Sequence, residues 1–261
     1  MSAFKERYGP CALVAGASAG LGAAFARKLA ELGLDLVLLA RRGPLLEDLA
    51  ASLRSKHGVA VETGVVDLGE RGLAPRLGHL LEGREIGLLV YNAAHSAIGP
   101  FLESPLDEHL RVLEVNCRGP LVLVHALGRA MARRGRGGIV LMTSLAGSQG
   151  NPLLTSYAAS KAFNLVLAEG LWAELTSRGV DVVACRAGAT QTPGFEASRP
   201  RRAVPMMEPE AVVARALASL GHGPSMVPGA LNRLAAFTLG RLVSRRMAIR
   251  IMGRATARLY G

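Results

Sequence analysis

Short apolar segments alternate with longer segments of helical pattern along most of the chain. The apolar segments are rich in valine, leucine and isoleucine and are apolar on both faces, which is typical of buried parallel strands. They predict six strands, at 11–16, 35–40, 60–67, 87–92, 138–144 and 181–187. Helices are expected between them, at 20–32, 45–57, 70–83, 106–134 and 155–178.

The expected helix ends coincide with glycines. Gly33, Gly58, Gly135 and Gly179 fall where the end of a helix favours a left-handed residue. The repeated strand-then-helix order predicts an α/β protein with a doubly wound, Rossmann-like parallel sheet. No linker divides the 261 residues, so we expect a single domain with a helical C-terminal extension.

The rhythm changes after residue 187. Residues 188–207 contain prolines and the basic run Arg199-Pro200-Arg201-Arg202, and they predict a mobile loop. A helix at 208–220 and a short strand near Met226 are expected next. The tail at 229–261 has helical composition, with seven arginines and no acidic residue.

The positive charge is concentrated in this last part of the chain. The whole chain carries a net charge of +11, and residues 195–261 contribute 11 arginines and three glutamates. Such a surface can meet an anionic membrane, an acidic ligand or a nucleic acid, or it can be a solvated or partner-covered face. Nucleic acid is not expected, because no aromatic–basic interleaving accompanies the arginines. Peripheral membrane contact stays open, although the apolar face of the tail is imperfect.

Composition narrows the class further. Half of the residues are hydrophobic and 20% are charged, which excludes a disordered chain. The three cysteines are far apart, and no histidine pair has metal-ligand spacing, so no metal is expected. Free thiols suit a reducing, cytoplasmic location. The N-terminal apolar run is too short for a signal peptide, and no stretch is long enough for a transmembrane helix.

A glycine motif follows the first predicted strand and opens the first helix. It reads Gly16-Ala17-Ser18-Ala19-Gly20-Leu21-Gly22. Glycines permit a tight turn and close approach of a pyrophosphate, while the helix N-terminus offers free N–H groups and a positive dipole. The strand–turn–helix context therefore predicts a dinucleotide site rather than a turn without a ligand.

The end of the second strand indicates which dinucleotide binds. An acid at this point would hydrogen-bond the 2′-hydroxyl of NAD, but the sequence reads Ala40-Arg41-Arg42. A guanidinium binds a 2′-phosphate through charge-assisted hydrogen bonds. NADP(H) is therefore favoured over NAD, the alternative being two solvated loop arginines.

Three residues indicate proton-transfer chemistry. Tyr157 and Lys161 share one face of a predicted helix, and Ser144 ends the fifth strand, where ligands of such sheets bind. A nearby ammonium is expected to lower the pKa of the phenol from about 10. Tyr157 would then exchange a proton with a carbonyl or alcohol oxygen, and Ser144 would hydrogen-bond that oxygen.

Together these motifs resemble those of the short-chain dehydrogenase/reductase family, over about residues 10–195 and in the same order. The resemblance implies catalytic roles for Asn116, Ser144, Tyr157 and Lys161, with Asn116 holding a water in a proton relay. It also implies that Asp67 accepts from the adenine amino group and that Thr192 contacts the nicotinamide. The cofactor-binding set it implies is Gly16, Ser18, Ala19, Gly20, Leu21, Gly22, Arg41, Arg42, Asp67, Leu68, Asn92, Ala93, Ala94, Tyr157, Lys161, Gly188, Thr190 and Thr192.

Two positions depart from the family pattern. Tyr91 precedes Asn92-Ala93-Ala94, where the family usually has Asn-Asn-Ala-Gly. Ala187 precedes Gly188, where the family usually has proline, and Arg186 stands before it. Neither change removes a proton-transfer group, but both touch the expected cofactor cleft.

The expected activity is NADP-dependent interconversion of a ketone or aldehyde with an alcohol. In the family, loop 188–207 corresponds to a substrate lid, and the predicted walls of the substrate pocket are His95, Ser96, Ser144, Leu145, Leu153, Tyr157 and Phe195. Apart from Ser144 and Tyr157, which belong to the proton-transfer group, three of the five walls are apolar, so a lipophilic substrate is expected. One alternative is a 3-oxoacyl thioester of CoA or carrier protein, drawn by the basic tail; another is a non-catalytic NADPH-binding regulator. The resemblance implies a homodimer or homotetramer packed through the helices at 106–134 and 155–178.

Overall fold

The computed structural model describes residues 3–198, 200 and 205–260. Arg199, Arg201 and Arg202 of the predicted basic run lie outside the described residues. Within loop 188–207 the structure has a short helix, α8 (Pro193–Ala197), that the sequence pattern does not predict. It is too short to produce a hydrophobic period, and Thr192 begins it as an N-cap.

Seven strands form one parallel sheet in the order β3-β2-β1-β4-β5-β6-β7. They are β1 (Cys11–Ala15), β2 (Asp35–Ala40), β3 (Val61–Val65), β4 (Ile86–Tyr91), β5 (Gly137–Ser144), β6 (Val180–Ala187) and β7 (Ser225–Met226). All six predicted strands and the short strand at Met226 are confirmed. The strand order reverses beside β1, between β1 and β4, which is where ligands of such sheets bind.

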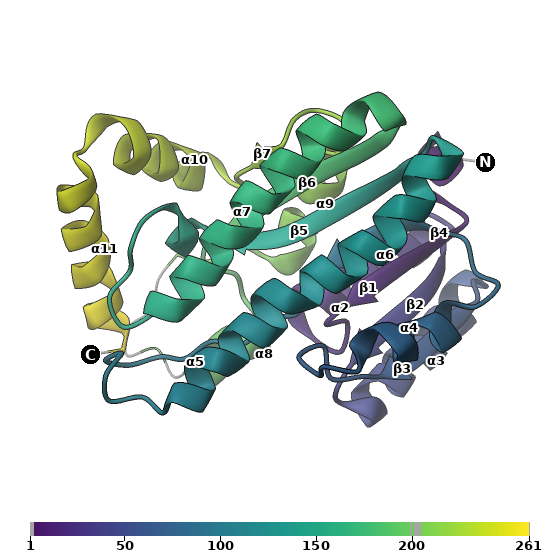
Figure 1. Cartoon of the computed structure of the whole chain (residues 1–261), viewed down its shortest axis with the longest axis horizontal. Helices are drawn as coiled ribbons and strands as arrows, with labels where there is room; N and C mark the ends of the chain where they lie inside the picture. The colour runs from purple at the N-terminus through teal and green to yellow at the C-terminus, as the bar shows by residue number, and fades with distance from the viewer. Residues whose placement is uncertain (1–2, 199, 201–204, 261) are drawn as a thin grey trace.

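Helices cover both faces of the sheet, as a doubly wound fold requires (Figure 1). The helices α2 (Gly20–Glu31), α3 (Gly43–His57) and α9 (Pro209–Ala218) pack on one face. On the other face lie α4 (Leu73–Leu81), α6 (Gly119–Arg134) and α7 (Thr155–Leu175). Successive residues of β1 alternate between the two cores, which explains why the predicted strands are apolar at consecutive positions.

The four glycines expected at helix ends all have positive φ. Gly58 and Gly135 are the left-handed caps of α3 and α6, and each donates its amide to a carbonyl of the last helical turn. A side chain is disfavoured in this conformation, so these positions end the helices where the sequence predicts.

The helix predicted at 106–134 is not a regular α-helix. It consists of α5 (Leu106–Leu113), a π-helical turn at Glu114–Arg118 and α6. The turn contains Asn116, and its cause is described with the site below. A second difference is α1 (Ala3–Tyr8), which is too short to show a period; Tyr8 anchors it by donating to Asp181 at 2.8 Å.

The C-terminal extension is helical, as predicted. It comprises α10 (Ala230–Phe237), a π-helical turn at Thr238–Leu242 and α11 (Arg245–Tyr260), which together stand at one end of the molecule (Figure 1). No helix within the described ranges combines the length and the apolarity needed to cross a membrane.

Candidate active site

A cleft of about 690 Å³ opens along the carboxyl ends of the strands, where the order reverses. The structure brings most of the predicted site residues together in its lining. These are Gly16, Ser18, Ala19, Gly20, Leu21, Arg41, Arg42, Asp67, Leu68, Asn92, Ala93, Ala94, His95, Ser96, Ser144, Leu145, Tyr157, Lys161, Gly188, Thr190, Thr192 and Phe195.

Three predicted residues lie outside this lining. A Cβ on Gly22 would stand 1.9 Å from the Gly16 carbonyl oxygen, so Gly22 serves the close packing of α2 on the glycine turn. Leu153 is not part of the lining and its carbonyl accepts from the Gly99 amide, while the next residue, Leu154, lines the cleft. Asn116 is fully buried behind the lining.

The glycine turn is shaped for close approach of a ligand to the backbone. Gly16 and Gly20 have positive φ, and a Cβ on Gly16 would lie 2.7 Å from the Ala93 backbone. Asn92 holds the turn by donating from Nδ2 to the Gly16 carbonyl at 3.0 Å. The N-terminus of α2 therefore opens into the cleft with free N–H groups, as a pyrophosphate site requires.

The arginines after β2 lie beside this turn. Arg42 donates to the Ser18 hydroxyl from Nη2 at 3.0 Å and from Nε at 3.3 Å. Arg41 lines the same end of the cleft, where Asp67 is the one carboxylate among the described lining residues. Two guanidiniums after β2, together with the Ser18 hydroxyl of the glycine turn, fit a 2′-phosphate better than a ribose hydroxyl pair.

Asp67 has a partner that sequence analysis missed. Both of its carboxylate oxygens accept from the Arg111 guanidinium of α5, and the Gly69 amide donates to Oδ1 at 3.0 Å. Burial works to raise the pKa of Asp67, but the Gly69 amide and Arg111 outweigh it, and the pKa lies below its usual range. Arg111 thus orients an ionised carboxylate at the adenine end of the cleft. Hydrogen bonding between Asp67 and the adenine stays a prediction.

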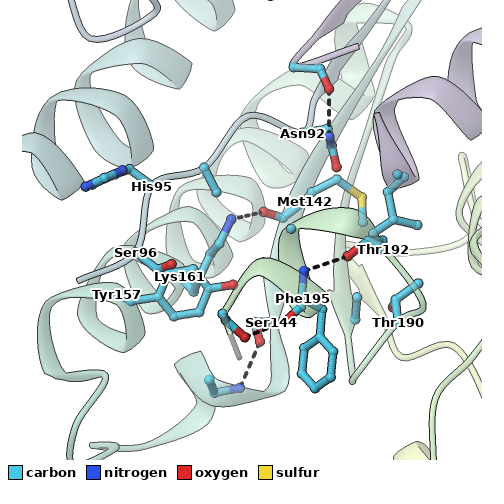
Figure 2. A pocket seen from close by; sticks show the side chains of 18 of the residues that line it. Asn92, His95, Ser96, Met142, Ser144, Tyr157, Lys161, Thr190, Thr192 and Phe195 are labelled. Atoms are coloured by element: carbon cyan, nitrogen blue, oxygen red, sulfur yellow. Dashed lines mark hydrogen bonds between the residues drawn. The ribbon is translucent and has the colours of Figure 1, made fainter. Parts of the chain in front are cut away.

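The proton-transfer residues meet at the end of β5. Figure 2 shows the Tyr157 hydroxyl of α7 turned toward Ser144, whose hydroxyl accepts from the Ala146 amide at 3.2 Å. Lys161 lies one turn further along α7, with Nζ 5.6 Å from the centroid of the Tyr157 ring. Its ammonium donates to the Met142 carbonyl at 2.9 Å, which fixes the side chain beneath the cleft floor.

The expected lowering of the pKa of Tyr157 is wrong for this structure. Burial raises the pKa of Tyr157, and the hydrogen bond with Ser144 only partly offsets that effect. Burial also lowers the pKa of Lys161 to about 8. The expectation considered the ammonium but not the loss of water around both groups. The structure therefore keeps Tyr157 protonated, which is the form that donates a proton to a carbonyl oxygen.

Asn116 lies in the π-helical turn and is held by several hydrogen bonds. Its Nδ2 donates to the His95 carbonyl at 2.8 Å and to the Ser160 hydroxyl at 2.9 Å, and its Oδ1 accepts from the His95 amide at 2.7 Å. These bonds tie the helix to the loop after β4 and to α7. The regular i+4 partner of the Asn116 carbonyl is missing, because Pro120 has no N–H; π turns are frequent at functional sites. The Asn116 carbonyl accepts from Asn164 at 2.8 Å and retains a second lone pair. The relay water predicted from the family would have to use an acceptor lone pair of Asn116, because both protons of its Nδ2 are donated to protein partners.

The two departures from the family pattern leave the cleft open. The Tyr91 side chain lies in the core between the sheet and α6 and donates to the Val115 carbonyl at 2.6 Å. It therefore contacts the π turn and does not line the cleft. Arg186 points away from the cleft and donates to Ser148 at 2.7 Å. Ala187 and Gly188 still line the cleft beside it.

Thr190, Thr192 and the ring of His95 each form a hydrogen bond with a nearby residue. Thr192 accepts from the Phe195 amide at 3.2 Å as the cap of α8, so its hydroxyl proton stays free for a carboxamide oxygen. Thr190 donates to the Gly188 carbonyl at 3.1 Å. The His95 ring is bonded to Glu108 at 2.8 Å at the rim of the cleft.

The C-terminal helix closes the substrate end of the cleft, which sequence analysis did not predict. Five side chains of α11 line it: Met252, Ala255, Thr256, Leu259 and Tyr260. Their spacing is that of a single helix face, a signal present in the sequence but hidden by the arginines between them. Two contacts hold the helix in place: Thr256 donates to Asn151 at 2.6 Å, and the Tyr260 hydroxyl is 3.3 Å from the Ser198 hydroxyl next to α8.

Comparison with known proteins agrees with this geometry. The family model of the short chain dehydrogenases matches residues 10–203. A 7beta-hydroxysteroid dehydrogenase of Clostridium sardiniense is 32% identical over 233 residues, 88% of this chain and 89% of the relative. A very-long-chain 3-oxoacyl-CoA reductase of Pyricularia oryzae is 35% identical, and the match spans 82% of this chain and 65% of that protein.

Solved structures give the same result. A structure of a 7beta-hydroxysteroid dehydrogenase superposes with a TM-score of 0.90 at 28% identity, covering 95% of this chain and 98% of the other. A short-chain dehydrogenase from Sphingobium yanoikuyae in complex with NADPH superposes with a TM-score of 0.79 at 32% identity, covering 89% and 94% of the two chains. With the glycine turn and the Ser144–Tyr157–Lys161 group in one cleft, the chain belongs to the short-chain dehydrogenase/reductase family of oxidoreductases.

Proposed function

We propose that this protein is an NADP(H)-dependent reductase of a lipophilic ketone or aldehyde, also able to oxidise the matching alcohol. The observation that carries the proposal is the composition of the substrate end of the cleft. Leu145, Leu154 and Phe195 meet the apolar face of α11 there, next to the Tyr157 hydroxyl. Two arginines, Arg41 and Arg42, are the guanidiniums among the described lining residues, and both lie at the opposite, cofactor end.

The chain's own residues supply binding, orientation and the proton. When bound, NADPH supplies the hydride to the carbonyl carbon. The Ser144 hydroxyl orients the carbonyl oxygen, and the protonated Tyr157 donates its proton to that oxygen as charge develops on it. Lys161, held by the Met142 carbonyl, places a positive charge beneath the phenol at the moment it loses its proton.

A 3-oxoacyl thioester is the second candidate, because some relatives are very-long-chain 3-oxoacyl-CoA reductases. The basic tail offers less support for it than the sequence suggests. The five arginines of α11 are exposed and lie outside the cleft lining. The tail therefore turns its apolar face to the cleft and its charge to solvent.

A substrate comparison tests the proposal. Initial rates of NADPH oxidation should be measured on a steroid ketone, on an uncharged long-chain methyl ketone and on a 3-oxoacyl-CoA of equal chain length. We expect the neutral ketones to equal or exceed the thioester in kcat/KM. A tenfold preference for the thioester in kcat/KM, about 1.4 kcal/mol of transition-state stabilisation, would instead favour a reductase of 3-oxoacyl thioesters. No oxidation with any of the three would overturn the proposal.

Assembly and location form part of the same proposal. A homodimer or homotetramer through α5, α6 and α7 is supported by exposed apolar side chains on those helices, among them Leu106, Leu113, Leu121 and Val166. Light scattering on the wild type and on Val166→Glu tests this, with dissociation expected for the variant. A cytoplasmic location stays a prediction from the free cysteines.

Replacing Arg42 with alanine is expected to raise the KM for NADPH by about 10- to 100-fold, the usual effect of losing a charge-assisted hydrogen bond. The efficiency with NADH should stay within about threefold, because NADH has no 2′-phosphate for Arg42 to bind. Steady-state kinetics with both cofactors measure the change, and Arg178→Ala, at an exposed arginine outside the cleft, is the control. Equal losses with NADPH and NADH would contradict a phosphate-binding role.

The pH dependence of kcat/KM for NADPH should follow the ionisation of the Lys161 ammonium. Its pKa is lowered to about 8, so the ammonium is present below that pH and is lost as the pH rises through it. The kcat/KM for NADPH, which reports the free enzyme, should be level from pH 6.5 to 7.5 and fall about tenfold per unit well above pH 8. Lys161→Arg should extend the plateau upward, because a guanidinium stays charged there. A level profile to pH 10 in the wild type would contradict this assignment.

A further inference from the structure

The C-terminal extension presents an apolar face that no described residue covers. Leu231, Leu234, Phe237 and Leu242, on α10 and the turn after it, are 77%, 63%, 56% and 70% exposed. The first three are spaced by three residues and therefore lie within about a third of the helix circumference. Single exposed apolar side chains are common on protein surfaces, but four large ones on one short helical segment are typical of an interaction site.

The charge carried by this part of the chain has a single sign. The sequence has eight arginines and no aspartate or glutamate after Glu210. Arg233, Arg241, Arg245 and Arg246 of the same segment are exposed. An apolar face on a segment whose charged residues are all arginines matches a surface that is apolar inside and negatively charged outside.

A groove of about 710 Å³ adjoins the apolar face, and Phe237 belongs to both. Three guanidiniums line it, from Arg186, Arg233 and Arg241, with no carboxylate among the described lining residues. None of the three forms an ion pair within the described part of the chain, and Nε of Arg186 is buried without a hydrogen-bond partner. A phosphodiester would fit such a group of donors.

We propose that α10 and the turn after it dock on the surface of an anionic phospholipid bilayer. The four apolar side chains enter the boundary between headgroups and acyl chains, and the arginine groove binds a lipid phosphate. Docking is peripheral, since none of the described helices is long and apolar enough to span a membrane. The proposal concerns attachment of the protein and does not depend on its catalytic activity.

A second copy of the chain fits this face less well. A two-fold contact would place the same patch on itself, bringing Arg233, Arg241 and their neighbours against their own counterparts. The family's oligomers are instead expected on α5, α6 and α7, where other exposed apolar side chains lie. The bilayer surface satisfies both the apolar and the charged parts of the patch.

Docking here would place the cleft close to the lipid. Asn232 of α10 lines the cleft, between two neighbours, Leu231 and Arg233, that belong to the outer surface. The same extension continues into α11, which forms the apolar wall of the cleft. A substrate dissolved in the bilayer would therefore reach the cleft without crossing much water.

Vesicle co-sedimentation of the full-length protein tests the proposal. Vesicles of phosphatidylcholine alone should be compared with vesicles containing 30% phosphatidylglycerol, at 50 and 500 mM salt. We expect at least tenfold stronger partitioning to the anionic vesicles at low salt, with most of that gain lost at high salt through screening. Equal partitioning to both vesicle types, or none to either, would overturn the proposal.

Matched variants locate the contact. Leu234→Asp with Phe237→Asp should reduce partitioning at least tenfold, whereas Leu102→Asp, at a 95% exposed leucine outside the extension, should leave it unchanged. Unaltered NADPH affinity confirms that each variant is folded. Equal reduction by Leu102→Asp would contradict the assignment. Dissociation of the oligomer by the double variant, with vesicle binding unaffected, would show that a second copy covers this face and would also overturn it.

Discussion

Replacing Tyr157 with phenylalanine is expected to lower kcat/KM for carbonyl reduction by about 10²- to 10⁴-fold, the usual contribution of a positioned general acid. The phenol lines the cleft beside Ser144 and its pKa is held above its usual value, so it stays protonated and is placed to supply the proton to the reacting oxygen. NADPH affinity should change by less than about threefold, because the phosphates are bound at the other end of the cleft. Stopped-flow turnover and fluorescence titration measure the two quantities.

Tyr260→Phe is the matched control for that result. Tyr260 also lines the cleft, but its hydroxyl lies beside Ser198 and not beside Ser144. Removing it should cost less than about tenfold in kcat/KM. A Tyr157→Phe enzyme that kept more than a tenth of the wild-type activity would show that another group supplies the proton. No activity in the wild type or in the variant would favour the alternative of a non-catalytic regulator.

Removing residues 245–261 is expected to reduce kcat/KM for a bulky lipophilic ketone by at least 30-fold. The helix supplies Met252, Leu259 and Tyr260 to the cleft, and burial of one such apolar side chain by substrate contributes about 1.5–3 kcal/mol. A small ketone such as a four-carbon one should lose less than about fivefold, because it does not reach that wall. The measurement is kcat/KM for both ketones at saturating NADPH.

A point variant separates lost contact from lost folding, since Ala248 of α11 is buried in the body of the protein. Leu259→Ala should lower kcat/KM for the bulky ketone about tenfold, whereas Ile251→Ala, at an exposed position on the same helix, should have no effect. Equal effects of the two variants, or equal losses for both ketones, would mean that α11 is not a substrate wall.

The sheet and the cofactor end of the cleft were predictable from sequence because their signals are local. A buried parallel strand is a short apolar run, and Gly58 or Gly135 ends a helix by its own conformational freedom. The glycine turn, Arg42 and the Ser144–Tyr157–Lys161 set each follow a strand or share a helix face. Strand order then brings them to one edge without further information.

The remaining features depend on contacts between distant segments. The hydrogen bonds of Asn116 to His95 and Ser160 join segments far apart in the sequence, and the only local signal of the π turn is Pro120, which removes one backbone donor. Arg111 reaches Asp67 across 44 residues of sequence. The pKa of Tyr157 depends on how completely the fold removes water from it, which spacing along a helix does not reveal.

The role of the C-terminal tail shows the same distinction. Its sequence is dominated by arginine, so composition indicates a charged partner. In the structure the arginines of α11 face solvent while the residues between them line the cleft, and only the docking of α11 beside α8 establishes which face points inward.

The most direct test of carbonyl reduction by this protein is to follow the hydrogen itself. NADPH carrying deuterium at C4 of the nicotinamide, in the 4R and the 4S form separately, should be incubated with the protein and a lipophilic ketone, and the product alcohol analysed by mass spectrometry. One of the two forms should give an alcohol one mass unit heavier, with the deuterium on the carbinol carbon. Alcohol formed without deuterium from either form, or no alcohol at all, would contradict hydride transfer in this cleft.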